Sequence, residues 1–206
     1  MLAAHKINPY KDITDEDLME RFQNGNEKAF NEIVIRYRQR IVNFILGMVR
    51  DFDKAEDLAQ DTFLIVYERK HSYKRIAKLS TWIFTIAKNL TFTELRKVKR
   101  RKTYSVSELE PENGSNIIFW QNIEDGDNSF NKSMYSDGHI NITTDIIMNK
   151  IEELPDDFKI IINLRDIQEL SYEEISRIMD LAIGTVKSRL NRARIKLREL
   201  LLGEDK

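Results

Sequence analysis

The stretch GTVKSRLNRARIKL, from Gly184 to Leu197, carries the side chains whose types and spacing point most clearly to contact with a polyanion. On a helix, Val186, Leu190, Ala193 and Leu197 recur at steps of four, three and four residues and form one apolar stripe. Arginine can pair bidentately with guanine, Ser and Asn can read other base edges, and Lys can hold phosphates. The candidate DNA contacts on this helix are Thr185, Lys187, Ser188, Arg189, Asn191, Arg192 and Arg194.

The residues before this helix predict a helix-turn-helix. Ser171 and Glu174 have the spacing of a capping box and predict a helix over residues 171–180. The turn LAIG follows, and Thr185 is expected to cap the second helix, which in this motif enters the major groove with its N-terminal residues first. The alternative is an ordinary solvated helix whose basic residues favour the helix dipole. The capped first helix, the glycine turn and the scarcity of acidic residues favour DNA.

Charge is divided unevenly along the chain. The 206 residues sum to −1, but residues 1–102 hold 21 Lys and Arg against 14 Asp and Glu, a balance of +7. Residues 103–145 hold 1 against 8, a balance of −7, and residues 146–206 are nearly neutral at −1. Such asymmetry is typical of a protein that contacts polyanions.

Helices are expected throughout residues 14–102, which we predict to form a compact four-helix unit. Apolar residues recur there at three- and four-residue steps, the period of a helix with one buried face. The expected N-terminal caps are Thr14 with Asp17, Asn26, Asp53 with Glu56, and Ser80. Gly25 is expected to end the first helix.

The remaining chain divides into a linker and a second helical unit. Residues 103–145 lack any sustained period and are rich in Ser, Asn, Asp and Gly, which predicts an extended acidic linker. Residues 146–203 are helical again, with Pro155 expected at the first position of a helix. The expected fold is therefore all-α, with two helical domains (14–102 and 146–203) joined by the linker.

Several classes of protein are disfavoured by the composition. Without cysteine the chain has no disulfide, thiol nucleophile or zinc ribbon, and no stretch approaches the ~18 uninterrupted apolar residues of a membrane span. Paired carboxylates and a phosphate-cradling glycine loop are missing, and His5, His71 and His139 are scattered. We therefore expect a cytoplasmic protein that is not an enzyme, does not insert into membranes, and has no cofactor or metal.

Three motifs together resemble a known family. SYEEISRIMDLAIGTVKSRLNRARIKLREL resembles region 4 of bacterial RNA polymerase sigma factors of the extracytoplasmic-function (ECF) type, and LPDDFKIIINLRDIQELSYEEIS matches the approach to it. DKAEDLAQDTFLIVYE resembles region 2.2, and LSTWIFTIAKNLTFTELRKVKRR resembles regions 2.3 and 2.4. The motifs stand in the family's order and cover nearly the whole chain apart from the first dozen residues and the linker. The resemblance implies a factor that binds core RNA polymerase and directs promoter-specific transcription initiation.

This resemblance divides promoter recognition between the two domains. The helix of residues 184–197 would read the −35 element, while residues 14–102 would read the −10 element and help to open the duplex. Family members carry a base-capture loop where this chain has HSYKRIAKLSTW, and polar or aromatic groups can hold a base that has left the stack. Trp82 is expected to pack in the core, and the basic cluster at 96–102 has a solvated helix end as its alternative. The −10 candidates are Ser72, Tyr73, Lys74, Arg75, Lys78, Asn89, Arg96, Lys97 and Arg100.

Protein partners are also implied by the resemblance. The segment AEDLAQDTF would dock on the clamp helices of the largest polymerase subunit through Asp57, Gln60 and Asp61, although an ordinary amphipathic helix is the alternative. The other expected partners are the polymerase flap, promoter DNA and an anti-sigma factor, which the sequence neither requires nor excludes. The acidic linker would thread the polymerase channel, or else serve as a solvated tether.

Two other functions stay open at this point. A DNA-binding activator or repressor would bind duplex DNA alone, typically as a dimer, and would not need AEDLAQDTF. An interaction adaptor would use its basic helix on an acidic protein. Co-purification with core polymerase separates the first of these from a sigma factor, and a steep salt dependence of DNA binding would argue against the second.

Overall fold

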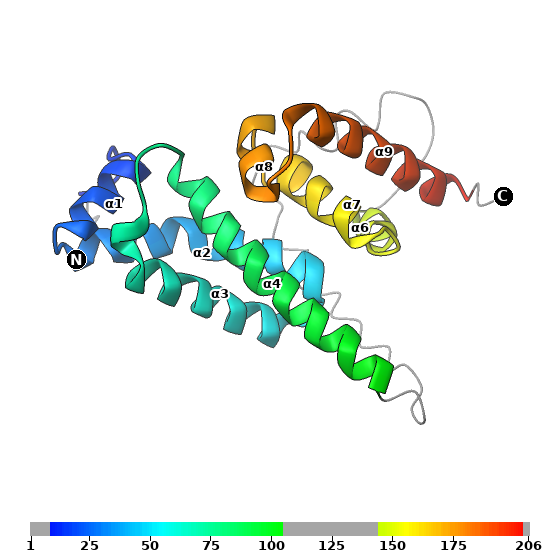
Figure 1. Cartoon of the computed structure of the whole chain (residues 1–206), viewed down its shortest axis with the longest axis horizontal. Coiled ribbons are helices and arrows are strands. Elements are labelled where there is room, and N and C mark those ends of the chain that lie inside the picture. Colours follow the sequence, from blue (N-terminus) through cyan, green and yellow to red (C-terminus); the bar gives the residue numbers. More distant parts are fainter. Residues whose placement is uncertain (1–8, 105–143, 204–206) are drawn as a thin grey trace, which may run out of the picture.

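Every regular element is helical in the residues that the computed structural model describes, 9–104 and 144–203 (Figure 1). The predicted all-α fold is thus confirmed, whereas residues 105–143 of the predicted linker lie outside the described residues. The first stretch, here called the front unit, contains α1 (Asp15–Gln23), α2 (Glu27–Val49), α3 (Phe52–Glu68), the 3₁₀ turn η1 (Lys70–Ser72) and α4 (Leu79–Tyr104). The second, the back unit, contains α6 (Thr144–Glu152), α7 (Asp156–Ile162), the π-helical turn η3 (Asn163–Ile167), α8 (Tyr172–Met179) and α9 (Ile183–Leu202).

The core of the front unit is built around α2, which contacts α1, α3 and α4. Phe22, Ile33, Phe44 and Phe84 are fully buried there and come from three different helices. The rings of Phe44 and Phe84 meet edge to face with centroids 5.4 Å apart, which ties α2 to α4. Each such buried side chain contributes about 1.5–3 kcal/mol to folding, so the apolar stripes hold the four helices together.

Two predicted helix starts and one predicted helix end are present in the front unit. The Oγ1 of Thr14 accepts the backbone N–H of Asp17 at 3.2 Å, and the Oδ1 of Asn26 accepts those of Lys28 and Ala29. Between α1 and α2, Gly25 has a φ of +94°, a conformation that favours glycine. The caps therefore set the start of each helix, and Gly25 allows the reversal between them.

Three other predicted starts were wrong by one or more residues. Arg50, the C-cap of α2, has a left-handed backbone conformation, and α3 begins two residues later. The N-cap of α3 is Asp51, whose Oδ1 accepts the N–H of Lys54 at 2.9 Å, and not the predicted Asp53. Helix α4 starts at Leu79, whose N–H is satisfied by Glu16 of α1, so that Ser80 is already inside the first turn. Pro155 is the N-cap of α7 and precedes its first helical residue.

The back unit packs α9 against α6, α7 and α8. The predicted capping box of α8 is complete, because Ser171 Oγ accepts from Glu174 N–H at 3.2 Å and Glu174 Oε2 accepts from Ser171 N–H at 2.9 Å. The start of α9 differs from the prediction: Asp180 ends α8 with a φ of 54°, and Ala182 then becomes the N-cap in place of Thr185. Thr185 therefore lies within the first turn of α9.

The two units pack against each other, which the sequence did not predict. Helix α8 lies beside α4 (Figure 1), and α7 with η3 meets α2. Several polar contacts cross this boundary, and they include hydrogen bonds as well as ion pairs. They are Ser80–Glu174 at 3.0 Å, Lys88 Nζ to the Ile178 carbonyl at 2.7 Å, Arg40 to the Gln168 carbonyl at 3.1 Å, Lys99–Asp156 at 2.6 Å, and Arg50–Glu152.

Candidate nucleic-acid interface

Helices α8 and α9 form a helix-turn-helix with a short, braced turn. The Oγ of Ser176 donates to the carbonyl of Leu181 at 2.5 Å, and the N–H of Leu181 donates back to the Ser176 carbonyl at 3.0 Å. These two bonds fix how α9 leaves α8. The apolar stripe of α9 is buried as predicted, with Val186 and Ala193 fully inaccessible to solvent. The inner side of α9 is therefore held firmly, and its opposite side faces outward.

The outward side of α9 presents a short polar and basic surface. Ser188 and Asn191 lie opposite the buried stripe, and Lys187 and Arg192 flank them. All four are exposed, and they occupy the first half of the helix. This is the part of a recognition helix that contacts base edges in a major groove.

Two predicted arginines of α9 are engaged by acidic neighbours. Arg189 Nη1 lies 2.9 Å from Asp157 Oδ2, and Arg194 makes a two-point contact with Asp166. Hydrogen bonding to Asp166 raises the pKa of Arg194 above its ordinary value. Thr185 is half-buried. These three residues border the outward surface, where a DNA contact by either arginine would compete with its carboxylate partner or use the N–H groups that the partner leaves over.

The segment between α3 and α4 forms a loop with an exposed basic tip. Ser72, Lys74, Arg75 and Lys78 are exposed as the sequence suggested, and Ile76 beside them is 81% exposed. Arg75 forms an ion pair with Asp17 at 2.7 Å. Hydrogen bonds with Thr14 and Arg75 lower the pKa of Asp17. Basic side chains are thus presented at the tip, where a nucleic-acid strand could reach them.

Tyr73 differs from the other loop candidates because its ring is buried. The ring packs against Trp82 with centroids 5.4 Å apart, and its hydroxyl donates to the Ala77 carbonyl at 2.8 Å. Burial, with a smaller effect of Glu16, raises the pKa of Tyr73 to about 12. Tyr73 therefore supports the loop from inside, and Trp82 is half-buried, as expected of a packing residue.

A second exposed stripe follows the outer side of α4. Asn89, Arg96 and Arg100 are separated by seven and four residues, so they share one face of the helix, and all three are exposed. Lys97 is also exposed and lies 3.6 Å from Glu94, the one acidic residue of α4. Phosphates are the natural ligands of such a row.

The opposite flank of α4 is covered by the back unit. Ser80, which is 8% exposed, and Lys88 both bond to α8 there, and Lys78 Nζ lies 3.5 Å from Glu174. Burial lowers the pKa of Lys88. Sequence reasoning missed Ser80 and Lys88 as contact residues because a lone serine or lysine in a helix carries no periodic signal. Their partners are 94 and 90 residues away.

Helix α3 presents the acidic surface predicted for a protein partner. Asp57, Gln60 and Asp61 are exposed, while Leu58 and Ala59 beside them are buried. Two exposed apolar residues that the sequence analysis did not single out accompany them. Leu64 is 55% exposed and follows Gln60 by one turn of α3. Ile35 is 72% exposed and lies on α2, one turn before Arg38, whose guanidinium pairs with Glu56 of α3. The surface therefore combines carboxylates with apolar side chains.

Residues 9–104 and 144–203 contain neither a candidate metal site nor a helix suited to span a membrane. These residues hold no group of three or more His, Asp or Glu side chains that could bind a metal ion. None of the helices among them is long and apolar enough to cross a membrane.

Two family models match the chain. The model of sigma-70 region 2 matches residues 33–101, and that of sigma-70 region 4 matches residues 144–197. The first range lies within the front unit and includes the loop and the exposed stripe of α4, and the second covers most of the back unit and includes the outward side of α9.

Curated relatives align over most of their length. The ECF RNA polymerase sigma-E factors of Salmonella typhimurium and Escherichia coli (strain K12) are each 35% identical to this chain over 183 residues, which is 88% of this chain and 91% of the relative. The sigma-E factor of Haemophilus influenzae is 33% identical over 182 residues, covering 88% and 92%.

Solved structures have the same fold. The sigma factor RpoE from Bartonella quintana, in complex with the anti-sigma factor NepR, superposes with a TM-score of 0.64 at 26% identity and covers 87% of this chain and 99% of that one. CnrH, in complex with the cytosolic domain of CnrY, superposes with a TM-score of 0.63 at 19% identity and covers 93% and 99%.

Proposed function

The chain belongs to the ECF RNA polymerase sigma factors, and from that premise we propose which of its surfaces carries each part of the work. It binds core RNA polymerase and directs promoter-specific transcription initiation. In this proposal residues 14–102 bind the polymerase and the −10 element, residues 146–203 bind the −35 element, and the acidic segment 103–145 joins them. The protein then acts in the cytoplasm as an initiation factor and not as an enzyme, and it needs no cofactor.

The observation that carries the proposal is the exposed face of α9. Lys187, Ser188, Asn191 and Arg192 point away from a buried stripe on a helix that follows a capped support helix. Ser188 and Asn191 offer hydrogen bonds to base edges, and Lys187 and Arg192 add either base or phosphate contacts. Thr185, Arg189 and Arg194 border this face and would add contacts at its edge, where the two arginines are paired with Asp157 and Asp166.

The −10 element is assigned to the loop and to the outer stripe of α4. Ser72, Lys74, Arg75 and Lys78 surround the loop, and Asn89 lies on the adjoining helix. Arg96, Lys97 and Arg100 would hold the phosphates of the same strand, where each released counterion adds to affinity and to its salt dependence. Tyr73 would act indirectly, by shaping the loop that the other residues line.

The polymerase clamp is assigned to the exposed surface of α3 with its neighbour on α2. Asp57, Gln60 and Asp61 would steer the chain toward basic partner residues. Leu64 and Ile35 would be covered at the same time, and apolar area removed from water adds roughly 25 cal/mol per Å² before the cost of association. A mixed surface of this kind suits a partner that binds reversibly during the transcription cycle.

An anti-sigma factor is a further proposed partner, and the polymerase flap would meet the back unit. The support for the first is the Bartonella quintana relative, which was solved with one bound. In this chain the two units already contact each other, so such an inhibitor would find them close together.

Run-off transcription tests the proposal. Purified chain and core polymerase are mixed with genomic DNA fragments, and the transcripts are sequenced to locate start sites. Defined starts that share −10 and −35 sequences are the expected result. A chain that binds core polymerase yet supports no defined start would overturn the assignment, and so would promoter binding without polymerase.

A further inference from the structure

We propose that Gln23 of α1 is a positioning residue for promoter opening, because its side chain fixes the loop that is assigned to the −10 element. This inference rests on the proposed function of that loop. Gln23 itself is only partly exposed and lies at the last position of α1, 47 residues before the first loop residue that it contacts.

One amide nitrogen holds both ends of the turn that opens the loop. The Nε2 of Gln23 donates to the carbonyl of Lys70 at 2.6 Å and to the carbonyl of Tyr73 at 3.1 Å. An amide carries two hydrogens, so both bonds can form at once. These carbonyls bracket η1, and a carboxylate in the same place would offer oxygen lone pairs to two other oxygens. The position therefore requires a hydrogen-bond donor, which an ionised glutamate lacks.

The rest of α1 holds the same loop at its tip and at its end. Asp17 pairs with Arg75 at 2.7 Å, and Glu16 accepts the N–H of Leu79, where α4 begins, at 3.0 Å. Lys70 adds a cation–π contact, with its Nζ 4.5 Å from the centre of the Phe22 ring. All of these contacts come from one helix, so α1 acts as a platform for the whole segment.

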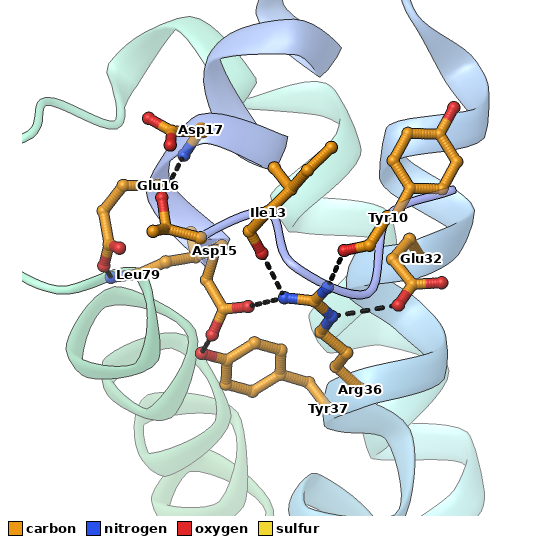
Figure 2. Close-up of polar contacts among 10 residues, drawn as sticks. Tyr10, Ile13, Asp15, Glu16, Asp17, Glu32, Arg36, Tyr37 and Leu79 are labelled. Atoms are coloured by element: carbon orange, nitrogen blue, oxygen red, sulfur yellow. Dashed lines mark hydrogen bonds and ion pairs between the residues drawn. The ribbon is translucent and has the colours of Figure 1, made fainter. Parts of the chain in front are cut away.

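That platform is itself anchored to α2, as Figure 2 shows. The guanidinium of Arg36 donates to Asp15 at 2.7 Å, to the carbonyl of Ile13 at 2.8 Å and to Glu32 at 3.0 Å. Asp15 also accepts the hydroxyl of Tyr37, which is buried. Burial followed by the hydrogen bond to Asp15 raises the pKa of Tyr37, so this hydroxyl stays protonated and keeps donating. The loop is thus connected to the rigid core of the front unit.

A fixed loop matters for capturing a base. Ordering a mobile residue on binding costs conformational entropy, so a loop that is ordered beforehand retains more of its contact energy. It also presents its side chains in one arrangement, which is what discrimination between bases requires. Removing the hydrogen bonds from Gln23 to η1 is therefore expected to lower both the affinity for the −10 strand and the preference for its correct bases.

The experiment uses holoenzyme made with Gln23→Glu, Gln23→Met or a control chain. The control is Gln39→Glu, which makes the same change at an exposed glutamine whose Nε2 donates to Asn43 of the same helix. One probe is a single-stranded oligonucleotide with the −10 sequence of a start site found by run-off transcription, along with versions changed at one base. The other is a duplex with the −35 sequence.

Both Gln23 variants should bind the correct −10 strand about 5- to 20-fold more weakly, as expected for one or two lost hydrogen bonds, and the ratio of correct to altered strand should fall toward one. Affinity for core polymerase and for the −35 duplex should match that of the Gln39→Glu control. An unchanged ratio would overturn the inference, as would an equal loss on every probe, since that marks general destabilisation. If wild-type holoenzyme shows no base preference at −10, the proposed function fails instead.

Discussion

The Oγ of Ser80 donates a 3.0 Å hydrogen bond to Oε1 of Glu174, joining the second residue of α4 to the capping box of α8. Glu174 thereby does two things at once: its Oε2 caps its own helix, and its Oε1 binds the front unit. Lys78 approaches the same carboxylate at 3.5 Å. The start of the helix assigned to the −10 element is thus held against the start of the helix-turn-helix, and a promoter that engages both units must break this contact if it draws them apart.

Glu174→Gln should weaken the folded state in a pH-dependent way. Burial opposes the charge of Glu174, but hydrogen bonds from Ser171 and Ser80 and the nearby Lys78 lower its pKa below the ordinary value of 4.5. A group with a lowered pKa in the folded state stabilises the fold above its unfolded pKa and loses that effect as the pH falls through the folded value. The variant keeps the shape and an acceptor, so a loss of about 1 kcal/mol is expected near neutral pH.

Urea unfolding at about pH 7 and about pH 3 checks this prediction. The difference in free energy of unfolding between wild type and Glu174→Gln should shrink at the lower pH, because the stabilising effect of the charge is lost as the pH falls toward the lowered pKa of Glu174. Glu173→Gln is the matched control, since Glu173 is exposed and lies outside the capping box. A difference that is the same at both pH values would contradict the assigned cause.

Gly47→Ala should separate the two units without harming the front one. A Cβ at Gly47 would lie 2.6 Å from the Nδ2 of Asn163, a side chain of the back unit that is only 3% exposed. Within α2 itself alanine is favoured over glycine by about 1 kcal/mol, so the helix should become more stable. Small-angle scattering of the intact chain should report a larger radius of gyration. Gly184→Ala is the control because its Cβ would meet nothing within 4 Å, and an unchanged radius in Gly47→Ala would show that Asn163 gives way instead.

Short-range features of the sequence predicted much of the fold. The Ser171–Glu174 box, the Asn26 cap and the buried stripe of α9 each depend on residues within a few positions of one another. The starts of α3, α4 and α9 were missed because a competing neighbour decides them. Glu16 satisfies the first N–H of α4 from another helix, and the left-handed Asp180 lets α9 begin before Thr185.

The exposed site residues followed from composition and spacing, but their partners did not. Lys187, Ser188 and Arg192 could be placed outward from the helical period alone. The burial of Tyr73 and the pairing of Arg189 with Asp157 depend on where the chain returns in space. The same is true of Gln23, whose two acceptors are backbone carbonyls and leave no trace in residue types.

Asp57→Arg combined with Asp61→Arg should impair assembly with core polymerase. Both carboxylates are exposed on α3, so the double reversal should leave the helix and its buried face intact while it repels basic partner residues. Affinity for core polymerase should fall by at least about tenfold, as like charges across an interface cost several kcal/mol. Glu153→Arg with Glu173→Arg makes the same charge change on the back unit as a control. Competition binding against labelled wild type measures the effect, and equal affinities for the two double variants would remove α3 from the interface.

Arg189→Ala should relax sequence preference at the −35 element. Arg189 lies in the second turn of α9 and pairs with Asp157 at 2.9 Å with its side chain 23% exposed, so DNA would give it a new partner beside Asp157 or in its place. If the new partner is a base edge, the loss is about 1–3 kcal/mol on the correct duplex and little on unrelated ones. Duplex binding by holoenzyme at fixed salt, with −35 sequences altered one base at a time, makes the measurement. Arg198→Ala, an exposed arginine farther along the same helix, serves as the control. A uniform loss on all sequences, together with a salt slope reduced by about one, would assign Arg189 to a phosphate instead.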